Sequence, residues 1–370
     1  MKIETLLSPK GRQQQIESFA SVERYVNDGS PSLEHRTVSA PYSPKDGESS
    51  FILPYQTITP NLARVLEANP SKEATQFIRD TNGNVLFYIH PDMVEQYGYS
   101  GGKDKVFPTS SGRTVCVFEK ENPLFVKLHY DGMLGRIIRK MEKKEVVQSL
   151  EVSAELDRQK SADTLPSTFG YMPETLGVLA NIGEKEIGYV VREFSVRSKL
   201  KSSDIPILIP WFALFSIDRG SPQDKPLLEQ WIRIVGKDSS LASSSTFFKD
   251  RFLFPMIESF CYLADRMGLI VDYNAQNFLV QPDGASNPQT IVMRDMQSTW
   301  SDTAKRKEKN LHPVFTRSMN IEAPDPKDRE YVFKQRSLYF DHKFSEYIIW
   351  PVIHQFAKSF GVDGDVLVKE

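Results

Sequence analysis

The sequence has little histidine and cysteine and no long apolar run. It contains six His and two Cys among 370 residues, without H-E-x-x-H or C-x-x-C spacing, so we expect no transition-metal centre. Cys116 and Cys261 lie in apolar segments, which favours buried, reduced thiols over a disulfide or a catalytic nucleophile. No stretch of about 18 apolar residues occurs and the N-terminus lacks a secretory apolar core, so we expect a cytoplasmic protein without membrane contact.

Large net charge and glycine-rich nucleotide motifs are also missing. The chain has 46 Lys and Arg against 48 Asp and Glu, a formal charge of -2, which argues against a nucleic-acid partner. The short run KRKEKN (305–310) is interpreted as a solvated loop. No G-x-S-x-G, G-x-x-x-x-G-K-[ST] or G-x-G-x-x-G motif occurs, which argues against the usual hydrolase, P-loop and dinucleotide-binding classes. Any phosphate site must therefore be built from side chains.

Composition and the distribution of turn-forming residues predict a globular chain in three parts. Hydrophobic residues make up 40% and charged residues 25% of the sequence, which is typical of a folded protein. Residues 1–50 are rich in Ser, Pro, Gln and charge, and we expect a flexible segment with one helix near 12–27. The segment 51–200 is expected to be β-rich, and 201–370 mainly helical.

Short apolar runs in the second part predict a small antiparallel sheet. The stretch at 81–91 is a turn leading into a strand, 113–130 is typical of a hairpin, and 186–194 predicts a further strand. Apolar residues at helical spacing and i,i+4 charge pairs predict a long amphipathic helix from Met133 to about Lys160.

The third part alternates apolar helices with short strands. Its apolar segment at 205–217 is interrupted by prolines, and the stretch at 237–246 is expected to lead into a buried helix at 247–268 that ends at Gly268. The stretch at 322–330 is expected to be a surface loop, and 344–361 predicts a last amphipathic helix. The fold class is therefore α+β.

Two strand ends in this part carry carboxylate and carboxamide groups. Asp272 precedes Asn277 by five positions in DYNAQNFLV, and Asp295 ends the apolar run of IVMRDMQ. Such oxygen ligands suit Mg²⁺, which combines one or two carboxylates with phosphate oxygens and water. The pattern is the layout of a kinase site, in which the first Asp orients the acceptor and the other two residues hold metal. Capping of turns is an equally simple interpretation.

Cationic residues cluster in the second part. The polar loop FPTSSGRT (107–114) opens onto the hairpin, and Lys127 lies among apolar neighbours on the returning strand. Arg139 follows twelve positions later. Ser111, Arg113, Lys127 and Arg139 can converge on a triphosphate, because guanidinium groups bind phosphate oxygens in a bidentate way. Solvation of the neighbouring Arg136 and Lys140 and capping of a turn by Ser110 remain alternatives.

Five motifs, in order and at similar spacing, resemble the NRPS-independent siderophore synthetases, the aerobactin-synthetase-like ATP-dependent ligases. The family pattern is T-S-S-x-R-T, then K-L on a strand, an arginine twelve residues beyond that lysine, H-x-Q-N, and R-D after the next strand. This chain has Thr109–Thr114, Lys127-Leu128, Arg139, Asn274–Asn277 and Arg294-Asp295. The chain has Asn274 where the family has histidine.

The resemblance implies a palm-and-fingers architecture distantly like a kinase, with an ATP site between a β-rich fingers region (51–200) and a palm-like region (201–370). It implies a catalytic set of Lys127, Arg139, Asn274 and Asp272, an ATP-binding set of Ser111, Arg113, Thr114, Lys127, Arg139, Asn277 and Arg294, and Mg²⁺ ligands Asn277 and Asp295.

The implied activity is the joining of a carboxylic acid to an amine or alcohol through an acyl-adenylate, as in siderophore biosynthesis. Displacement at phosphorus relies mainly on positioning and charge neutralisation, which agrees with these residue types. A kinase-like phosphotransferase that acts on a small-molecule hydroxyl and a non-catalytic nucleotide-binding module are the alternatives. The resemblance also allows a homodimer.

Overall fold

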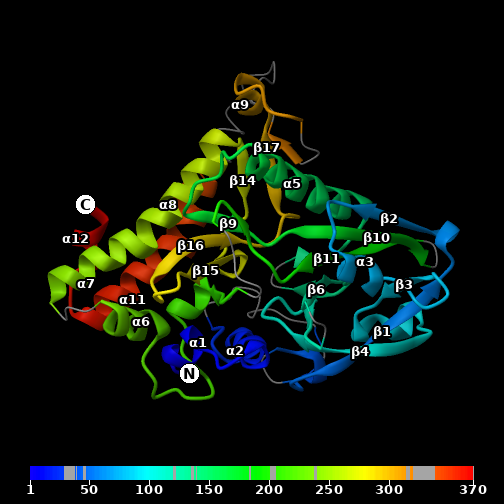
Figure 1. Cartoon of the computed structure of the whole chain (residues 1–370), viewed down its shortest axis with the longest axis horizontal. Coiled ribbons are helices and arrows are strands. Elements are labelled where there is room, and N and C mark those ends of the chain that lie inside the picture. The colour runs from blue at the N-terminus through cyan, green and yellow to red at the C-terminus, as the bar shows by residue number, and fades with distance from the viewer. Residues whose placement is uncertain are drawn as a thin grey trace.

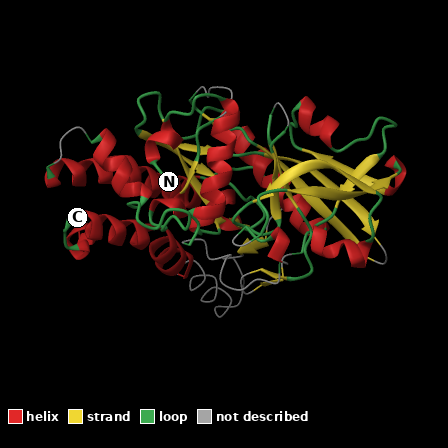
Figure 2. Cartoon of the chain, turned by 90° about the horizontal axis from the view of Figure 1, so that it is seen from below, coloured by secondary structure: helices red, strands yellow, loops and turns green. Residues whose placement is uncertain are grey.

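The structure is a computed structural model that describes residues 1–28, 38, 40–44, 47–119, 122–134, 137–138, 140–182, 185–200, 206–236, 240–313, 317–319 and 338–369. The fold is mixed α/β, with an antiparallel sheet and a group of helices. The strands gather at one end of the molecule and most helices at the other, where both termini lie (Figures 1 and 2). The loop expected at 322–330 lies outside the described residues.

An eight-stranded antiparallel sheet forms the β-rich end, which is larger than the small sheet expected from the sequence. Its strand order is β2-β10-β11-β6-β5-β4-β1-β3. The expected hairpin is present as β5 and β6, in which Thr114 pairs with Lys127, and the strand expected at 186–194 is β11. The strands are β1 (Phe51–Ile58), β2 (Ala63–Glu67), β3 (Val85–Tyr88), β4 (Gly101–Pro108), β5 (Thr114–Val117), β6 (Leu124–Lys127), β10 (Glu174–Ile182) and β11 (Lys185–Glu193).

Helix α5 (Lys143–Ser161) covers one face of this sheet. It packs so closely on β10 that a Cβ at Gly177 would lie 2.3 Å from Val146 Cγ1, which only glycine avoids. The expected start of this helix at Met133 is wrong. Glu142 caps the helix through a capping box with Glu145, and the preceding residues form the two-stranded hairpin of β7 (Met133–Leu134) and β8 (Ile137–Ile138). The two short helices beside the sheet are α3 (Lys72–Phe77) and α4 (Val94–Tyr97).

A second sheet stands between the large sheet and the helices. Its order is β12-β9-β16-β15-β13, and only the β16–β9 pair is parallel among its described pairings. A third sheet has the order β14-β17-β18. The strands are β9 (Phe169–Tyr171), β12 (Arg197–Ser198), β13 (Ile209–Pro210), β14 (Leu269–Val271), β15 (Phe278–Pro282), β16 (Pro288–Met293), β17 (Thr299–Asp302) and β18 (Arg317–Met319).

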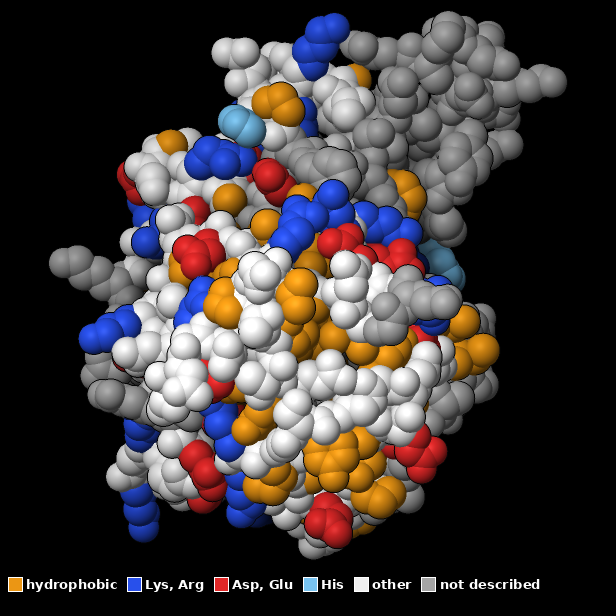
Figure 3. All heavy atoms as spheres, turned by 90° about the vertical axis from the view of Figure 1, so that its right-hand side faces the viewer, with side chains coloured by type: hydrophobic (Ala, Val, Ile, Leu, Met, Phe, Trp, Pro, Cys, Tyr) orange, Lys and Arg blue, Asp and Glu red, His pale blue; other side chains and the backbone are white. Residues whose placement is uncertain are grey.

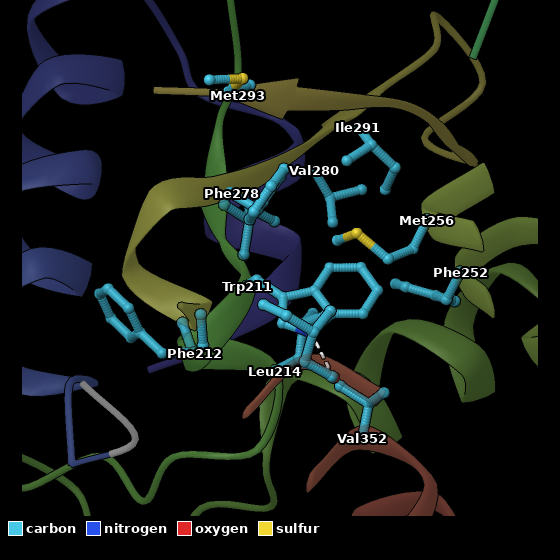
Figure 4. Packing of buried hydrophobic residues seen from close by; sticks show 14 of the residues in the cluster. Trp211, Phe212, Leu214, Phe252, Met256, Phe278, Val280, Ile291, Met293 and Val352 are labelled. Atoms are coloured by element: carbon cyan, nitrogen blue, oxygen red, sulfur yellow. Dashed lines mark hydrogen bonds between the residues drawn. The ribbon is translucent and has the colours of Figure 1, made fainter. Parts of the chain in front are cut away.

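The helical end encloses the largest apolar core. Trp211 lies among the side chains of this core (Figure 4), and its indole donates to the carbonyl of Ile348 at 2.8 Å. The helix expected at 247–268 is present but starts earlier, because Ser240 caps its first turn. The elements are η5 (Trp211–Leu214), α6 (Leu227–Val235), α7 (Leu241–Phe248), η6 (Lys249–Leu253), α8 (Phe254–Cys261), η7 (Tyr262–Arg266), η9 (Leu338–Ile349), α11 (Trp350–Phe360) and α12 (Gly364–Lys369).

Two N-terminal helices pack against the rest of the chain. The expected helix is present as α2 (Arg12–Tyr25), preceded by α1 (Ile3–Leu7). Ile3 and Val22 are fully buried and belong to the large core. The described part of the N-terminal segment therefore contributes to the folded body, and α2 carries the carboxylate of Glu23 into the interior.

Two surface expectations are corrected by the structure. The run at 305–310 is not a loop: residues Thr303–Glu308 form helix α9, and Arg306 is buried against Glu155 at 2.7 Å. Cys116 is buried as expected, but Cys261 is exposed because it shares the outer face of α8 with the exposed Phe254 and Ile257.

The face at the β-rich end carries apolar side chains among charged ones (Figure 3). No helix in the described part of the chain is both long and apolar enough to cross a membrane.

Candidate active site

A cleft lies where the large sheet meets the second sheet. The loop between β4 and β5 forms one wall, and residues around β15 and β16 form the other. The cleft is open to solvent at its mouth. It is lined by Thr109, Ser111, Arg113, Thr114, Phe125, Lys127, Leu134, Arg192, Asp272, Asn274, Gln276, Asn277, Arg294 and Asp295. The structure thus brings together nine of the ten residues that the sequence singled out.

The loop from Thr109 to Thr114 has a fixed shape. Thr109 Oγ1 donates to the carbonyl of Thr114 at 2.7 Å, and Ser111 Oγ accepts from the amide of Thr114 at 3.0 Å. Gly112 has φ +78°, in the left-handed region that favours glycine. Ser111 therefore caps a turn and also lines the cleft. The sequence interpretation had given this capping role to Ser110, whose hydroxyl instead accepts from Gln276 Nε2 at 3.3 Å.

Lys127 and Asp295 form an ion pair inside the cleft. Burial lowers the pKa of Lys127 to about 8, although Asp295 and Glu174 oppose this shift. Burial disfavours the charge of Asp295, but the positive charges of Lys127 and Arg192 outweigh that effect and hold the pKa of Asp295 well below its usual range. Asp295 has φ +80°, and such backbone strain is concentrated at functional sites.

Two arginines hold further positive charge in the cleft. Arg113 donates to Gln297 Oε1 at 2.7 Å. Arg192, on β11, pairs with the buried Glu174 at 2.5 Å, while its Nε is buried without a hydrogen-bond partner in the described part of the chain. The sequence analysis did not identify Arg192. The pattern that identified Lys127, a cationic residue inside an apolar strand, is also present around Arg192.

The segment at the start of β15 is a short, tightly bonded turn. Asn274 Oδ1 accepts from the amide of Gln276 at 3.0 Å and so caps η8 (Ala275–Asn277). Asn277 Nδ2 donates to the carbonyl of Asp272 at 3.0 Å. Asn274 therefore has a structural role in addition to its place in the cleft.

The guanidinium group of Arg294 lines the cleft but also makes a hydrogen bond and an ion pair with other residues. Its Nε donates to the carbonyl of Gln276 at 2.7 Å, and its Nη1 pairs with Glu23 Oε1 at 2.6 Å. The other oxygen of Glu23 accepts from the amide of Ser110 at 2.9 Å. Glu23 thus connects the two walls of the cleft through helix α2, and nothing in the local sequence around it indicated this role.

Arg139 lies outside the described residues. Among the described residues, the charged groups that line the cleft are four cations and two carboxylates, Asp272 and Asp295. Two of these cations are paired with buried carboxylates behind the lining, Arg192 with Glu174 and Arg294 with Glu23. The cleft is thus rich in cationic hydrogen-bond donors, which suit an anionic ligand. In the described residues there is no cluster of three or more His, Cys, Asp or Glu that could hold a metal.

Solved structures with this architecture include siderophore synthetases. ATP-bound aerobactin synthetase IucA from Klebsiella pneumoniae matches 96% of this chain and 70% of its own, with 15% identity and a TM-score of 0.61. The chain has the fold of these synthetases. The petrobactin biosynthesis protein AsbB from Bacillus anthracis matches 97% of this chain and 70% of its own, with 13% identity and a TM-score of 0.62.

Aerobactin synthetase IucC from Klebsiella pneumoniae matches 86% of this chain and 60% of its own, with 14% identity and a TM-score of 0.60. No protein-family model matches the sequence, and no curated protein matches it either. The likeness is therefore one of fold, over nearly the whole of this chain.

Proposed function

We propose that this chain is an ATP- and Mg²⁺-dependent ligase of the siderophore-synthetase kind. It activates a carboxylic acid as an acyl-adenylate, releases pyrophosphate, and joins the acyl group to an amine or alcohol. The observation that carries the proposal is the cleft with its four cationic side chains, which gathers the motif residues in a fold shared with ATP-bound aerobactin synthetase IucA.

The cations of the cleft fit a triphosphate. Lys127, Arg113 and Arg192 lie on adjacent strands of the large sheet or beside them, since Lys127 pairs with Thr114 on one side and with Val190 on the other. The buried Nε of Arg192 has no hydrogen-bond partner among the described residues, and it is a donor that a phosphate oxygen can satisfy. Charged donors in a buried site bind phosphate more strongly than surface groups do.

The carboxylate and carboxamide oxygens fit Mg²⁺ bound together with phosphate. Asp295 and Asn277 lie at neighbouring strand ends, because the amide of Arg294 donates to the carbonyl of Asn277 at 2.8 Å. Mg²⁺ needs only one or two such protein ligands when phosphates and water supply the others. The ion would neutralise phosphate charge and hold the triphosphate in one orientation.

Lys127 and Asp295 neutralise each other in this structure. In the proposed complex Lys127 would bind a phosphate oxygen and Asp295 would hold the metal ion, so that neither charge would be buried without a counter-charge. The carboxylate oxygen of the substrate attacks the α-phosphorus, and the bond to pyrophosphate breaks. Positioning and charge neutralisation by these side chains carry this step, without a covalent protein nucleophile.

The proposal is tested by measuring whether a carboxylic acid substrate promotes the exchange of radioactive pyrophosphate into ATP. The protein is incubated with ATP, Mg²⁺, labelled pyrophosphate and each member of a panel of carboxylic acids. We expect exchange with at least one acid, and AMP release once amines or alcohols are added. The Asp295→Asn variant should lose exchange, whereas Lys305→Met, which removes an exposed surface ion pair with Asp265, should keep it.

The same incubation separates the other two activities. Accumulation of ADP with a phosphorylated acceptor would instead indicate a phosphotransferase, for which the Asp272, Asn277 and Asp295 pattern is the supporting observation. ATP binding in a thermal-shift titration, with no turnover for any acid or acceptor, would indicate a nucleotide-binding module.

A further inference from the structure

Asp272 stands apart from the other charged groups of the cleft. The second carboxylate, Asp295, is paired with Lys127 within the cleft. The carboxylate of Asp272 instead contacts Lys343 Nζ at 3.5 Å, from helix η9 of the C-terminal region. A carboxylate beside a phosphate-binding site repels phosphate, so its presence there calls for a positively charged ligand.

Two hydrogen bonds hold the backbone of Asp272 in the turn. The main-chain carbonyl of Asp272 accepts from the amide of Asn274 at 2.8 Å and from Asn277 Nδ2 at 3.0 Å. The side chain of Asp272 is 19% exposed at the edge of the cleft. Asp272 is thus held by the same turn that positions Asn277, next to the proposed ATP site.

The position of Lys343 is fixed by its buried neighbour. Phe344 lies against Tyr273 with ring centroids 5.2 Å apart and stacks on Phe260 at 4.3 Å. Consecutive residues of η9 therefore contact consecutive residues of the cleft wall. The lysine itself remains 35% exposed, and its ammonium also lies 5.3 Å from the ring centre of Tyr347. Lys343 can leave Asp272 without disturbing the core.

We propose that Asp272 binds the ammonium group of an amine substrate, and that Lys343 Nζ occupies this position until the amine arrives. The inference rests on the proposed ligase function and specifies its nucleophile as a primary alkyl amine. Exchange of one ammonium for another keeps the charge of the site constant, whereas an alcohol would leave Asp272 without a counter-charge. The distance of 3.5 Å is long for a charge-assisted hydrogen bond, so Lys343 is a weak competitor.

The condensation step balances with this arrangement. The bound ammonium first gives one proton to water at the cleft mouth. The freed nitrogen lone pair forms the C–N bond to the acyl carbon, while the bond from that carbon to the AMP oxygen breaks and its electron pair leaves with AMP. The nitrogen then loses a second proton to water. The products are the amide, AMP and two protons.

The test uses two nucleophiles of equal length, butylamine and butan-1-ol, with hydroxylamine as a small, largely uncharged trap for the acyl-adenylate. The acid is the one that gives the strongest pyrophosphate exchange with the unmodified protein. Asp272→Asn and Lys343→Met are compared with Lys305→Met as the matched lysine control. Thermal unfolding is measured for each variant so that folding and function are judged separately.

The two variants are expected to act in opposite directions. Asp272→Asn raises the KM for butylamine at least tenfold more than it changes the KM for butan-1-ol or the rate of hydroxylamine trapping. Lys343→Met lowers the KM for butylamine about threefold, because the competing ammonium is gone. Lys305→Met changes neither value.

Three results would count against the assignment. An unchanged butylamine KM in both variants overturns it. Equal loss of pyrophosphate exchange and amine transfer in a folded Asp272→Asn variant also overturns it, because Asp272 then serves adenylation or the metal. If the unmodified protein shows no acid-dependent exchange, the proposed ligase function fails, and this inference fails with it.

Discussion

Lys127 and Asp295 form an ion pair across the cleft, although 168 positions separate them in the sequence. Removal of either partner leaves an uncompensated charge in the protein, which costs about 3 kcal/mol of unfolding free energy. We expect Lys127→Met to show this loss in urea denaturation. The double variant Lys127→Met/Asp295→Leu should recover most of the stability, because it removes both charges.

The double variant separates stability from function. It should be stable and yet bind ATP at least tenfold more weakly, as measured by isothermal titration calorimetry. Recovery of ATP binding together with stability would contradict the role of these residues as ligands. The pair removed by Lys305→Met is exposed, so that variant should change unfolding free energy by less than about 0.5 kcal/mol.

The affinity for ATP should fall at alkaline pH. The pKa of Lys127 is about 8 in the free protein, and a phosphate beside the ammonium favours the charged form and raises this pKa. Binding therefore takes up a proton above pH 8, and affinity falls by up to about tenfold for each pH unit there. Below pH 8 the lysine is already charged, so it does not make the affinity for ATP depend on pH there.

Titration calorimetry at a series of pH values between 7 and about 9.5 checks this expectation. The Lys127→Met variant is the control and should lack the alkaline fall. An equal slope in both proteins would assign the pH dependence to another group.

Asn274 should be replaceable by histidine without loss of the turn. Elsewhere in this chain His90 caps the short helix η4 (Pro91–Met93) by accepting from the amide of Asp92 through Nδ1, while its Nε2 donates to the carbonyl of Gly112 at 3.2 Å. A histidine at 274 can make the same cap and direct its other nitrogen into the cleft. We expect Asn274→His to lower the KM for ATP about threefold.

The cap itself can be tested at the same position. Asn274→Ala should lose about 1 kcal/mol of unfolding free energy, which is typical of a missing N-cap, and Asn274→His should lose less. Equal stability of the alanine variant and the unmodified protein would show that the cap contributes nothing to the turn.

Glu23 should be essential for the shape of the cleft although it lies on the N-terminal helix α2. Glu23→Gln leaves Arg294 with a buried charge and weakens the bond to the Ser110 amide. We expect a loss of about 3 kcal/mol of unfolding free energy and a higher KM for ATP. Glu17→Gln, on the exposed side of the same helix, is the matched control and should change neither.

The sequence indicated the local elements that hold the cleft. Lys127 among apolar neighbours identified its strand, and the polar loop before Arg113 was placed correctly between two strands. These signals work because strand periodicity and turn residues depend on nearby positions. The helix expected from Met133 failed because the apolar pairs at 133–134 and 137–138 also satisfy helical spacing, while strands of two residues are too short to show alternation.

Long-range partners were not visible in the sequence. Glu174 and Arg192 pair across two adjacent strands, and Arg306 is buried only because Glu155 of α5 reaches it. Such pairs are set by the packing of distant elements, which local periodicity does not report. The same holds for Glu23, whose partner Arg294 comes 271 positions later (294 − 23).

Two long-range contacts limit when the cleft can form during synthesis of the chain. One wall of the cleft is braced by Glu23 and the other carries the contact of Asp272 with Lys343. In a chain that is still being made, residue 23 emerges long before residue 294, and until then the carboxylate of Glu23 is solvated instead of paired. The cleft can therefore close only after residue 343 has emerged, so this site forms later than the local elements that build its walls.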